Sequence, residues 1–246
     1  MNACLLVPIY EHGAFVREVL EALGPARLPC IVVDDGSSEA TRRVLDRAEA
    51  ELPFVSVHHH KENRGKGGAL QTGYRLALAR GFDVAVQLDA DGQHDAADVP
   101  RFLAAASAHP GALVLGVPVF DDSVPRSRLW GRQLSRGIVW ALTLSFAVRD
   151  PLCGFRGIPL APTVALLERA PMGERMDFDP ELVVRLVWEG VPVIGLPTRV
   201  VYPEGGISHF DVLWDDVRLA GLYLRLAAEL PRRAPGLWAR RRRGRA

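Results

Sequence analysis

Residues 84–94 read Val-Ala-Val-Gln-Leu-Asp-Ala-Asp-Gly-Gln-His and carry the clearest structural signal in the chain. The mostly apolar beginning predicts a buried strand over 84–88, and the polar residues after it mark the end of that strand. Similar apolar runs, each bounded by turn residues, occur at 3–9, 29–34, 54–59 and 112–116. Their continuous Val, Ile and Leu content is typical of parallel strands that are buried on both faces.

Segments with helical periodicity alternate with these runs. We expect helices at 14–23, 38–51, 66–80, 96–108, 127–146, 162–168, 180–189 and 212–229, and one more strand at 191–201. Alternating strands and helices predict an α/β fold with a mostly parallel central sheet flanked by helices. No internal repeat or linker precedes residue 231. We therefore assign 1–230 to one domain and 231–246 to a basic tail without fixed structure.

The charge of the chain is unevenly distributed. Its 246 residues include 30 Lys and Arg against 29 Asp and Glu, and 48% are hydrophobic, which excludes disordered and fibrous proteins. Seven arginines and no acid lie between Arg232 and Arg245, so residues 1–230 are net acidic. A net acidic domain argues against a nucleic-acid partner, whereas the tail suits an anionic membrane surface.

Cysteine usage and the apolar runs indicate the compartment. Cys4, Cys30 and Cys153 are far apart and form no CxxC motif, which argues against a disulfide framework or a zinc site. The first apolar run ends at Pro8 without preceding basic residues, so we predict no signal peptide. The longest apolar run, 137–148, is well short of the roughly 20 residues of a transmembrane helix. We expect a cytoplasmic protein, peripheral on the inner face of the membrane.

Asp89 and Asp91 follow the strand that ends at Leu88. Two carboxylates at this spacing leave a strand end on the same side and can share one divalent cation, with Gln93 and His94 extending the ligand set. Oxygen ligands favour Mg²⁺ or Mn²⁺, which in turn bind a diphosphate. An EF-hand is excluded because no glutamate closes a loop of the required length. The alternative is a structural turn that caps the next helix.

Asp34 and Asp35 end another expected strand. Open α/β folds bind ligands at the carboxyl ends of their strands, where a carboxylate can accept from a base N–H or a ribose hydroxyl. The structural alternative is that Asp35 and Ser38 cap the following helix.

A glycine-rich turn, Asn63-Arg64-Gly65-Lys66-Gly67, precedes the helix at 66–80 and contains one of only two lysines. Backbone N–H groups at a helix N-terminus, together with a cation, favour an anion. The spacing of the glycines matches neither a Rossmann fingerprint nor a Walker A loop.

These motifs together resemble family 2 glycosyltransferases of the GT-A fold, which use nucleotide sugars. The resemblance rests on Val7-Pro8-Ile9-Tyr10, on 32–37, on 63–67 and on 88–94, in the order and spacing of the family. Residues 130–156, which contain Trp-Gly-Arg and Cys-Gly-Phe-Arg, are similar to the dolichol-phosphate mannosyltransferase branch.

The resemblance implies roles for matching positions. It implies a nucleotide site that comprises Pro8, Tyr10, Glu11, Asp35, Gly65, Lys66 and Asp89. It implies a Mg²⁺ or Mn²⁺ site at Asp89, Asp91 and Gln93, with Asp91 essential for catalysis. It also implies that Arg132, Ser135 and Arg156 contact the acceptor, a polyprenyl phosphate or another lipid-linked molecule. A late loop in similar transferases closes over the diphosphate, which makes Ser208 and His209 further candidates.

The chain departs from that branch at two places. Many members have Gly-Ser-Arg after the fifth strand, with the arginine on the acceptor phosphate, but this chain reads Gly116-Val117-Pro118. Arg126 or Arg128 could substitute, or the acceptor could lack a phosphate. Glu11-His12 stands where Asn-Glu is usual, which leaves the base of the donor open between uracil and guanine.

The resemblance implies a metal-dependent reaction with inversion at the anomeric carbon. A hydroxyl acceptor would need a carboxylate base, whereas a phosphate is already anionic. Asp150, Asp179 and Glu181 are the candidates for that base. Each has a structural alternative: Asp150 could shape its loop, and Asp179 or Glu181 could favour the N-terminus of a helix.

Two other functions compete with this interpretation. A sugar-phosphate nucleotidyltransferase would carry a Gly-rich basic loop where this chain has 8–11, and a nucleotide-sugar-binding protein without activity would have lost one of the aspartate pairs. Other conspicuous residues receive structural interpretations. We expect 58–60, three histidines, to be a solvated strand end, and Trp130, Trp140, Trp188 and Trp214 to pack inside the protein.

Overall fold

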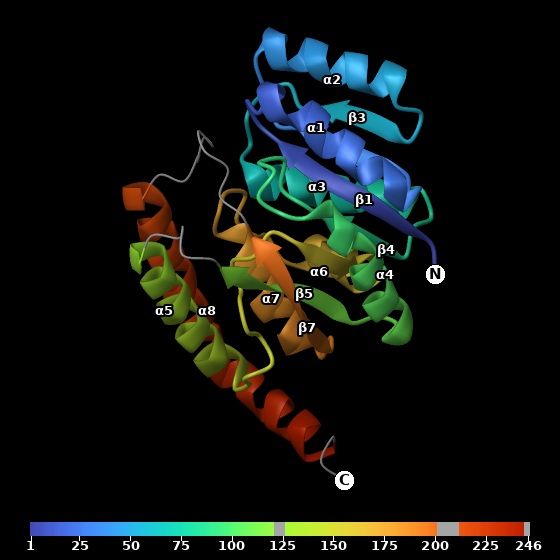
Figure 1. The fold of residues 1–246 in the computed structure, drawn as a ribbon. Coiled ribbons are helices and arrows are strands. Elements are labelled where there is room, and N and C mark those ends of the chain that lie inside the picture. Colours follow the sequence, from blue (N-terminus) through green and yellow to red (C-terminus); the bar gives the residue numbers. More distant parts are fainter. Residues whose placement is uncertain (121–125, 201–211, 244–246) are drawn as a thin grey trace.

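The computed structural model describes residues 1–120, 126–200 and 212–243, and in these ranges seven strands form one sheet with helices on both faces (Figure 1). Their order across the sheet is β3-β2-β1-β4-β6-β5-β7. The strands are β1 Ala3–Ile9, β2 Cys30–Asp34, β3 Val55–His59, β4 Val84–Gln87, β5 Leu113–Phe120, β6 Arg156–Pro159 and β7 Val193–Val200. The predicted α/β fold class is confirmed.

The core lies on both sides of the sheet. Cys4 and Leu6 of β1 point into one apolar cluster, while Leu5 and Val7 point into the other. All four side chains are fully buried. Because successive side chains of a strand point to opposite faces, a strand covered on both sides needs a continuous apolar run. This explains why residues 3–9 show no alternation of polar and apolar positions.

Strand β6 departs from the predicted parallel order. It lies between β4 and β5 and runs antiparallel to both, whereas β1 pairs in parallel with β2 and β4, and β5 pairs in parallel with β7. The sequence analysis missed this strand. Arg156-Gly157-Ile158-Pro159 is only four residues long and contains a glycine and a proline, so it shows neither apolar periodicity nor β propensity.

The helices match the predicted order, with shifts of at most three residues at the ends of α1 to α7 and a much longer α8. They are α1 Gly13–Leu23, α2 Glu39–Glu51, α3 Lys66–Ala79, α4 Val99–Ala108, α5 Arg126–Thr143, α6 Leu160–Arg169, α7 Phe178–Glu189 and α8 Val212–Arg243. Helix α5 ends before the predicted boundary at Phe146, because Leu144 adopts a left-handed φ of 50°.

Helix α8 corrects the prediction of a disordered tail after residue 230. It runs for 32 residues and includes Pro231 and Pro235, two residues that disfavour a helix interior. Leu237 is buried in the core cluster, and the guanidinium of Arg240 donates to the backbone carbonyl of Trp188. Packing against α7 therefore outweighs the helix-breaking tendency of the two prolines. Within the described ranges, no helix is long and apolar enough to span a bilayer.

The three cysteines are free thiols in the core. Cys4, Cys30 and Cys153 are all buried, in agreement with the prediction that they form no disulfide framework. Burial raises the pKa of Cys4 and of Cys153 to about 12. The thiolate, which is the reactive form, is therefore strongly disfavoured at neutral pH.

Candidate active site

The sheet topology brings the predicted motifs together. Strands β3, β2, β1 and β4 are adjacent and parallel, so their carboxyl ends lie along one edge of the sheet. Asp34 ends β2, Asp89 follows β4 by two residues, and Lys66 begins α3 directly after the β3 loop. The site is thus assembled from segments that the chain reaches in separate βα units.

Lys66 connects two of the predicted acids. Its Nζ lies 2.7 Å from Oδ1 and 2.9 Å from Oδ2 of Asp89, and 3.0 Å from Oδ2 of Asp179 at the start of α7. Burial alone would lower the pKa of Lys66, but the two carboxylates raise it above its usual value. Burial likewise opposes ionisation of Asp89, yet Lys66 holds the pKa of that carboxyl below its usual range.

Asp91 has the opposite electrostatic environment. Burial and the neighbouring charge of Asp89 raise the pKa of Asp91 to about 6, and one carboxylate oxygen accepts from the backbone N–H of Gln93 at 3.0 Å. The positive charge of Lys66 is therefore too small to balance the carboxylates of both Asp89 and Asp91. Among the described residues, no three His, Cys, Asp or Glu side chains are grouped so that they could hold a metal ion. The carboxylate and amide oxygens of Asp89, Asp91 and Gln93 are nevertheless of the donor types that a divalent cation prefers.

Gly154 packs against Asp89 more closely than any other residue type could. A Cβ at this position would lie 2.0 Å from Oδ2 of Asp89, well inside van der Waals contact. The turn that contains Gly154 is followed by β6, which begins beside the carboxyl end of β4, with Arg156 opposite Gln87, and runs antiparallel to it. The sequence analysis did not assign Gly154 to the site, since nothing local indicates which carboxylate approaches it.

Asp35 organises the glycine-rich turn. Its Oδ1 accepts from the backbone N–H of Arg64 at 3.0 Å and lies 2.9 Å from Nδ1 of His60, while Oδ2 accepts from the N–H of Gly65 at 2.6 Å. Gly65 has a φ of 95°, and a Cβ there would lie 2.5 Å from the carbonyl oxygen of Glu174. The buried Asp35 carboxylate thus fixes the turn that precedes α3.

The neighbouring acids are also engaged. Nδ1 of His59 lies 2.7 Å from Oδ2 of the fully buried Asp34. His60 is buried as well, whereas His58 is exposed, so the prediction of a solvated strand end at 58–60 holds for His58 and was wrong for His60. The carboxylate of Glu11 accepts from the N–H of Ser38 at 2.6 Å and from the hydroxyl of Thr41 at 3.1 Å. Glu11 therefore anchors the segment after β1 to the start of α2, beside the exposed Tyr10 and the buried Pro8.

Arg132 and Asp150 form a second polar pair beside the aspartates. Nη1 of Arg132 lies 2.7 Å from Oδ2 and 2.8 Å from Oδ1 of Asp150, and the guanidinium lies 5.2 Å from the ring centroid of Phe120. Oδ1 of Asp150 also accepts from the backbone N–H of Leu152 at 2.8 Å. Burial lowers the pKa of His94 to about 4, and both members of the pair are close enough to act on it, since Arg132 adds to this lowering and Asp150 opposes it.

The structure corrects two predicted site residues. Arg156 was expected to contact the acceptor, but it is fully buried and donates to the carbonyls of Cys153 at 2.7 Å, Pro151 at 2.8 Å and Asp179 at 2.9 Å. Glu181 was a candidate base, but its buried carboxylate accepts from Arg185 at 2.8 Å and from Arg225 at 2.9 Å. Residues two apart on a helix face nearly opposite directions, so Asp179 and Glu181 cannot both face Lys66.

The remaining acceptor candidates are placed differently or not described. Ser135 is buried close to Tyr223 of α8, so it lies between two helices and not in an open site. Ser208 and His209 lie outside the described residues, as do the side chains of Arg126 and Arg128.

Comparison with known proteins identifies the family. The profile described as "Glycosyl transferase family 2" matches residues 4–170, which include all the motifs on the strand ends. The chain belongs to glycosyltransferase family 2. This excludes the nucleotidyltransferase alternative, and the protein is a glycosyltransferase by family.

Individual relatives agree with this membership. Undecaprenyl-phosphate mannosyltransferase of Micrococcus luteus is 31% identical over 217 residues, which cover 85% of this chain and 87% of the relative. Polyprenol monophosphomannose synthase of Mycolicibacterium smegmatis is 28% identical over 211 residues, covering 83% and 79%. A mannosyltransferase of Pyrobaculum calidifontis, solved with GDP-Man and Mn²⁺, superposes with a TM-score of 0.63 at 19% identity and covers 94% and 64%. This last likeness confirms the expected GT-A fold.

Proposed function

We propose that this glycosyltransferase moves a hexose, with mannose the first candidate, from a nucleotide diphosphate sugar to a polyprenyl phosphate. The observation that carries the proposal is the cluster of Lys66, Asp89 and Asp91 at the carboxyl edge of the sheet. Its hard oxygen ligands and its single cation suit a diphosphate. The names of two relatives support the acceptor class, because one is called an undecaprenyl-phosphate mannosyltransferase and the other a polyprenol monophosphomannose synthase.

The donor would lie along the ends of β1, β2 and β4. Pro8, Tyr10 and Glu11 would border the nucleoside, and Asp35 would act on it through the Gly65 turn that it holds, since both of its oxygens already accept backbone hydrogen bonds. Lys66 lies in position to attract the diphosphate, and Asp89 is kept ionised by it.

Asp89, Asp91 and Gln93 would hold Mg²⁺ or Mn²⁺. The bound cation would neutralise the charge that develops on the leaving diphosphate. Asp91 is suited to this role because burial and the charge of Asp89 raise its pKa by more than Lys66 and the Gln93 N–H lower it, so that binding a cation relieves repulsion within the pair.

Arg132 is the best candidate for the acceptor phosphate. Asp150 holds its guanidinium through two contacts. Both residues lie close enough to His94, which follows the Asp89 and Asp91 motif, to act on the pKa of His94. A phosphate acceptor needs no general base, which agrees with the pairing of each candidate base, Asp150 and Asp179, with a cation. We assign Asp150 a positioning role toward Arg132.

We further propose that the anomeric carbon is inverted in a single displacement. A double displacement needs a carboxylate free to form a covalent intermediate. Asp89 and Asp179 are both paired with Lys66, and Asp179 lies 3.0 Å from Arg156 as well, so each is a weakened nucleophile. NMR of the anomeric proton in the product would test this directly.

A donor and acceptor screen tests the function. Purified full-length protein would be incubated with Mn²⁺, undecaprenyl phosphate and, separately, radiolabelled GDP-mannose and the common UDP-hexoses, and transfer into the organic phase would be counted. We expect transfer with one donor, dependent on the divalent cation. Donor binding without transfer to any polyprenyl phosphate would instead support a binding protein and contradict the proposal.

A further inference from the structure

Large apolar side chains are exposed on one flank of the molecule. Among the described residues, ten large hydrophobic side chains are exposed, and seven of them lie on α5, on the segment after it, or on α8. These seven are Trp130, Leu134, Phe146, Trp214, Val217, Leu224 and Trp238. The sequence analysis placed Trp130 and Trp214 inside the protein, but they are 77% and 62% exposed. Figure 1 shows α5 and α8 side by side on the outside of the domain.

On α8 these residues form one continuous row. With about 100° between successive residues, positions three, four and seven apart share a face. The exposed face of α8 carries Trp214, Val217, Gly221, Leu224, Ala228, Pro231, Pro235 and Trp238. The opposite face carries Leu219, Leu222, Leu226 and Leu237, which are buried against the domain. Helix α8 is therefore apolar on both faces, and only one of them is covered.

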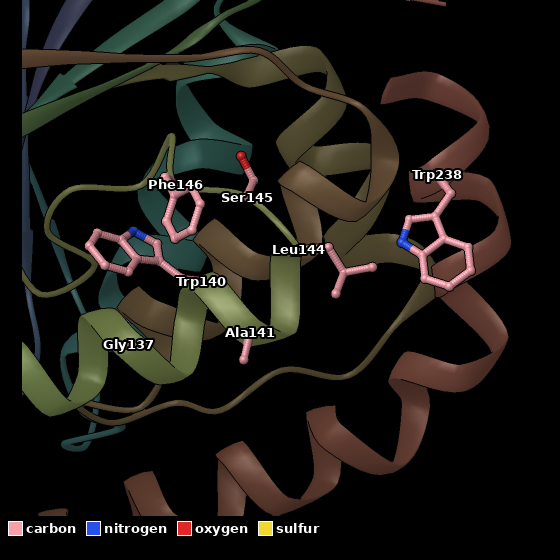
Figure 2. A pocket seen from close by; sticks show the side chains of 7 residues that line it. All are labelled: Gly137, Trp140, Ala141, Leu144, Ser145, Phe146 and Trp238. Atoms are coloured by element: carbon pink, nitrogen blue, oxygen red, sulfur yellow. The ribbon is translucent and has the colours of Figure 1, made fainter. Parts of the chain in front are cut away.

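Helix α5 repeats the pattern and joins the same surface. Trp130, Leu134, Gly137 and Ala141 follow one another at helical spacing and are all exposed. Gly137 and Ala141 line a pocket together with Trp140, Leu144, Ser145, Phe146 and Trp238 (Figure 2). Because this pocket contains residues of both rows, the two apolar rows meet at the end of α5. We call this joined surface the α5–α8 face.

The α5–α8 face is bordered by positive charge. Arg218, Arg225 and Arg232 are exposed, and their spacing of seven residues places them in a row beside the apolar residues of α8. Arg218 also pairs with Asp215 at 3.3 Å and Arg225 with Glu181 at 2.9 Å, while about half of each side chain stays exposed. From Val217 to Arg240, α8 carries no exposed acid, since Glu229 is partly buried and paired with Arg185. Four more arginines follow in the sequence, at positions 241 to 243 and 245.

We propose that the α5–α8 face docks on an anionic lipid bilayer, with α8 lying in the plane of the membrane surface. Tryptophan rings and leucines enter the boundary between headgroups and acyl chains, and arginines next to them bind lipid phosphates. A helix of 32 residues is about 48 Å long, so the face makes an extended contact.

Charge argues against a second copy of the chain as the occupant. A twofold dimer through this face would bring the arginine rows of α8 toward each other. Between Val217 and Arg240 that helix offers no exposed acid to pair with them. An anionic bilayer supplies the opposite charge along the whole row, and about 1 kcal/mol for each arginine near the surface accumulates. The inference concerns binding alone and stands apart from the proposed transfer reaction.

Flotation of the full-length protein with vesicles tests the inference. Vesicles of phosphatidylglycerol and phosphatidylcholine would be compared with vesicles of phosphatidylcholine alone, at low and high salt. We expect wild-type protein to float with the anionic vesicles, and to do so less at high salt. R218Q/R232Q should lower the partition coefficient roughly 30-fold, which is the loss of two arginine contacts.

Matched substitutions elsewhere serve as controls. R43Q/R47Q removes two exposed arginines from α2, which lies at the opposite end of the molecule (Figure 1), and should leave flotation unchanged. L224S should reduce flotation. V119S, which replaces an exposed apolar side chain on β5 and away from the α5–α8 face, should not. These side chains are exposed, so the variants should fold, and circular dichroism would verify it.

Two results would overturn the inference. One is equal flotation of wild type, L224S and R218Q/R232Q. The other is a wild-type dimer in sedimentation equilibrium that L224S dissociates, in the absence of vesicle binding, because the face would then be an interface between copies.

Discussion

The donor side of this transferase and the side of α5 and α7 differ in how well the sequence predicts the role of a residue. On the donor side, Asp35, Lys66 and Asp89 lie together as expected, because each follows a strand of one parallel sheet. On the side of α5 and α7, Arg156 and Glu181 had been assigned to the site but are buried in structural ion pairs. The carboxyl end of a parallel strand fixes where a side chain emerges, whereas the surroundings of Arg156, at the start of the antiparallel β6, and of Glu181, on α7, depend on which elements pack against them.

The sharpest test of this contrast compares Asp91 with Asp150. We expect Asp91→Ala to reduce kcat/KM by at least about 1000-fold, since the charge stabilisation of the leaving group is lost. Asp150→Asn should reduce it only about 10-fold, because Arg132 keeps a hydrogen-bonding neighbour. Steady-state transfer assays in saturating Mn²⁺ would measure both. Comparable losses in the two variants would remove the distinction between the two sides.

Gly154 gives the next largest expected effect. Gly154→Ala would push the Asp89 carboxylate away, because the new Cβ would lie 2.0 Å from Oδ2, and the contact of Asp89 with Lys66 would be lost. We expect about a 100-fold loss of kcat/KM and weaker donor binding by calorimetry. Gly131→Ala on α5, where a Cβ meets nothing within 4 Å, is the control and should leave activity unchanged. An active Gly154→Ala enzyme would mean that Asp89 tolerates displacement.

Substitution of Glu181 should lower the stability of the fold and leave kcat nearly unchanged. Its carboxylate is fully buried and pairs with Arg185 and Arg225. Removing one partner of a buried pair leaves an uncompensated charge, so Glu181→Gln should cost about 3 kcal/mol of unfolding free energy. Urea unfolding would measure this loss, while the kcat of the folded fraction should stay within about twofold of wild type. A large fall in kcat without destabilisation would return Glu181 to the catalytic candidates.

The smallest expected effect is the pH dependence of cation binding. The pKa of Asp91 in the folded protein, about 6, is above its usual value of 3.8, so the fold favours its protonated form, and the stability that this contributes at lower pH is lost as the pH rises from about 4 to about 6. A divalent cation competes with that proton. Mn²⁺ should therefore raise Tm by several degrees more at pH 7.5 than at pH 5. Asp91→Asn should lose most of this difference, and an unchanged pH dependence in that variant would assign it to another group.

Sequence patterns predicted the donor side well. Strand β1 begins and ends at the predicted residues, and the strands before the Asp34 and Asp89 motifs shift by one residue or less at their ends. Long apolar runs with polar ends leave few alternative structures. The patterns could not predict β6, which has no apolar periodicity. They could not predict the approach of Gly154 to Asp89 either, because it depends on how β6 pairs with β4.

Helix α8 was misjudged for a physical reason. Prolines and arginines after residue 230 favour an irregular chain locally, but Leu237 is buried in the core cluster and Arg240 contacts α7, and these tertiary contacts keep the segment helical. Trp130 and Trp214 were misjudged in the opposite direction. Their helical spacing indicates an apolar row, yet spacing alone does not say whether the domain covers that row.

The burial of all three native thiols makes this protein a convenient background for site-specific labelling. Cys4, Cys30 and Cys153 should react with maleimide only after unfolding, because burial favours the protonated thiol and blocks access by the reagent. A single new cysteine on an exposed position of α8, such as Ala228, would then carry the sole fluorophore without removal of native residues. An environment-sensitive dye there would report the depth of the helix in a bilayer, and dyes at other positions would report its orientation.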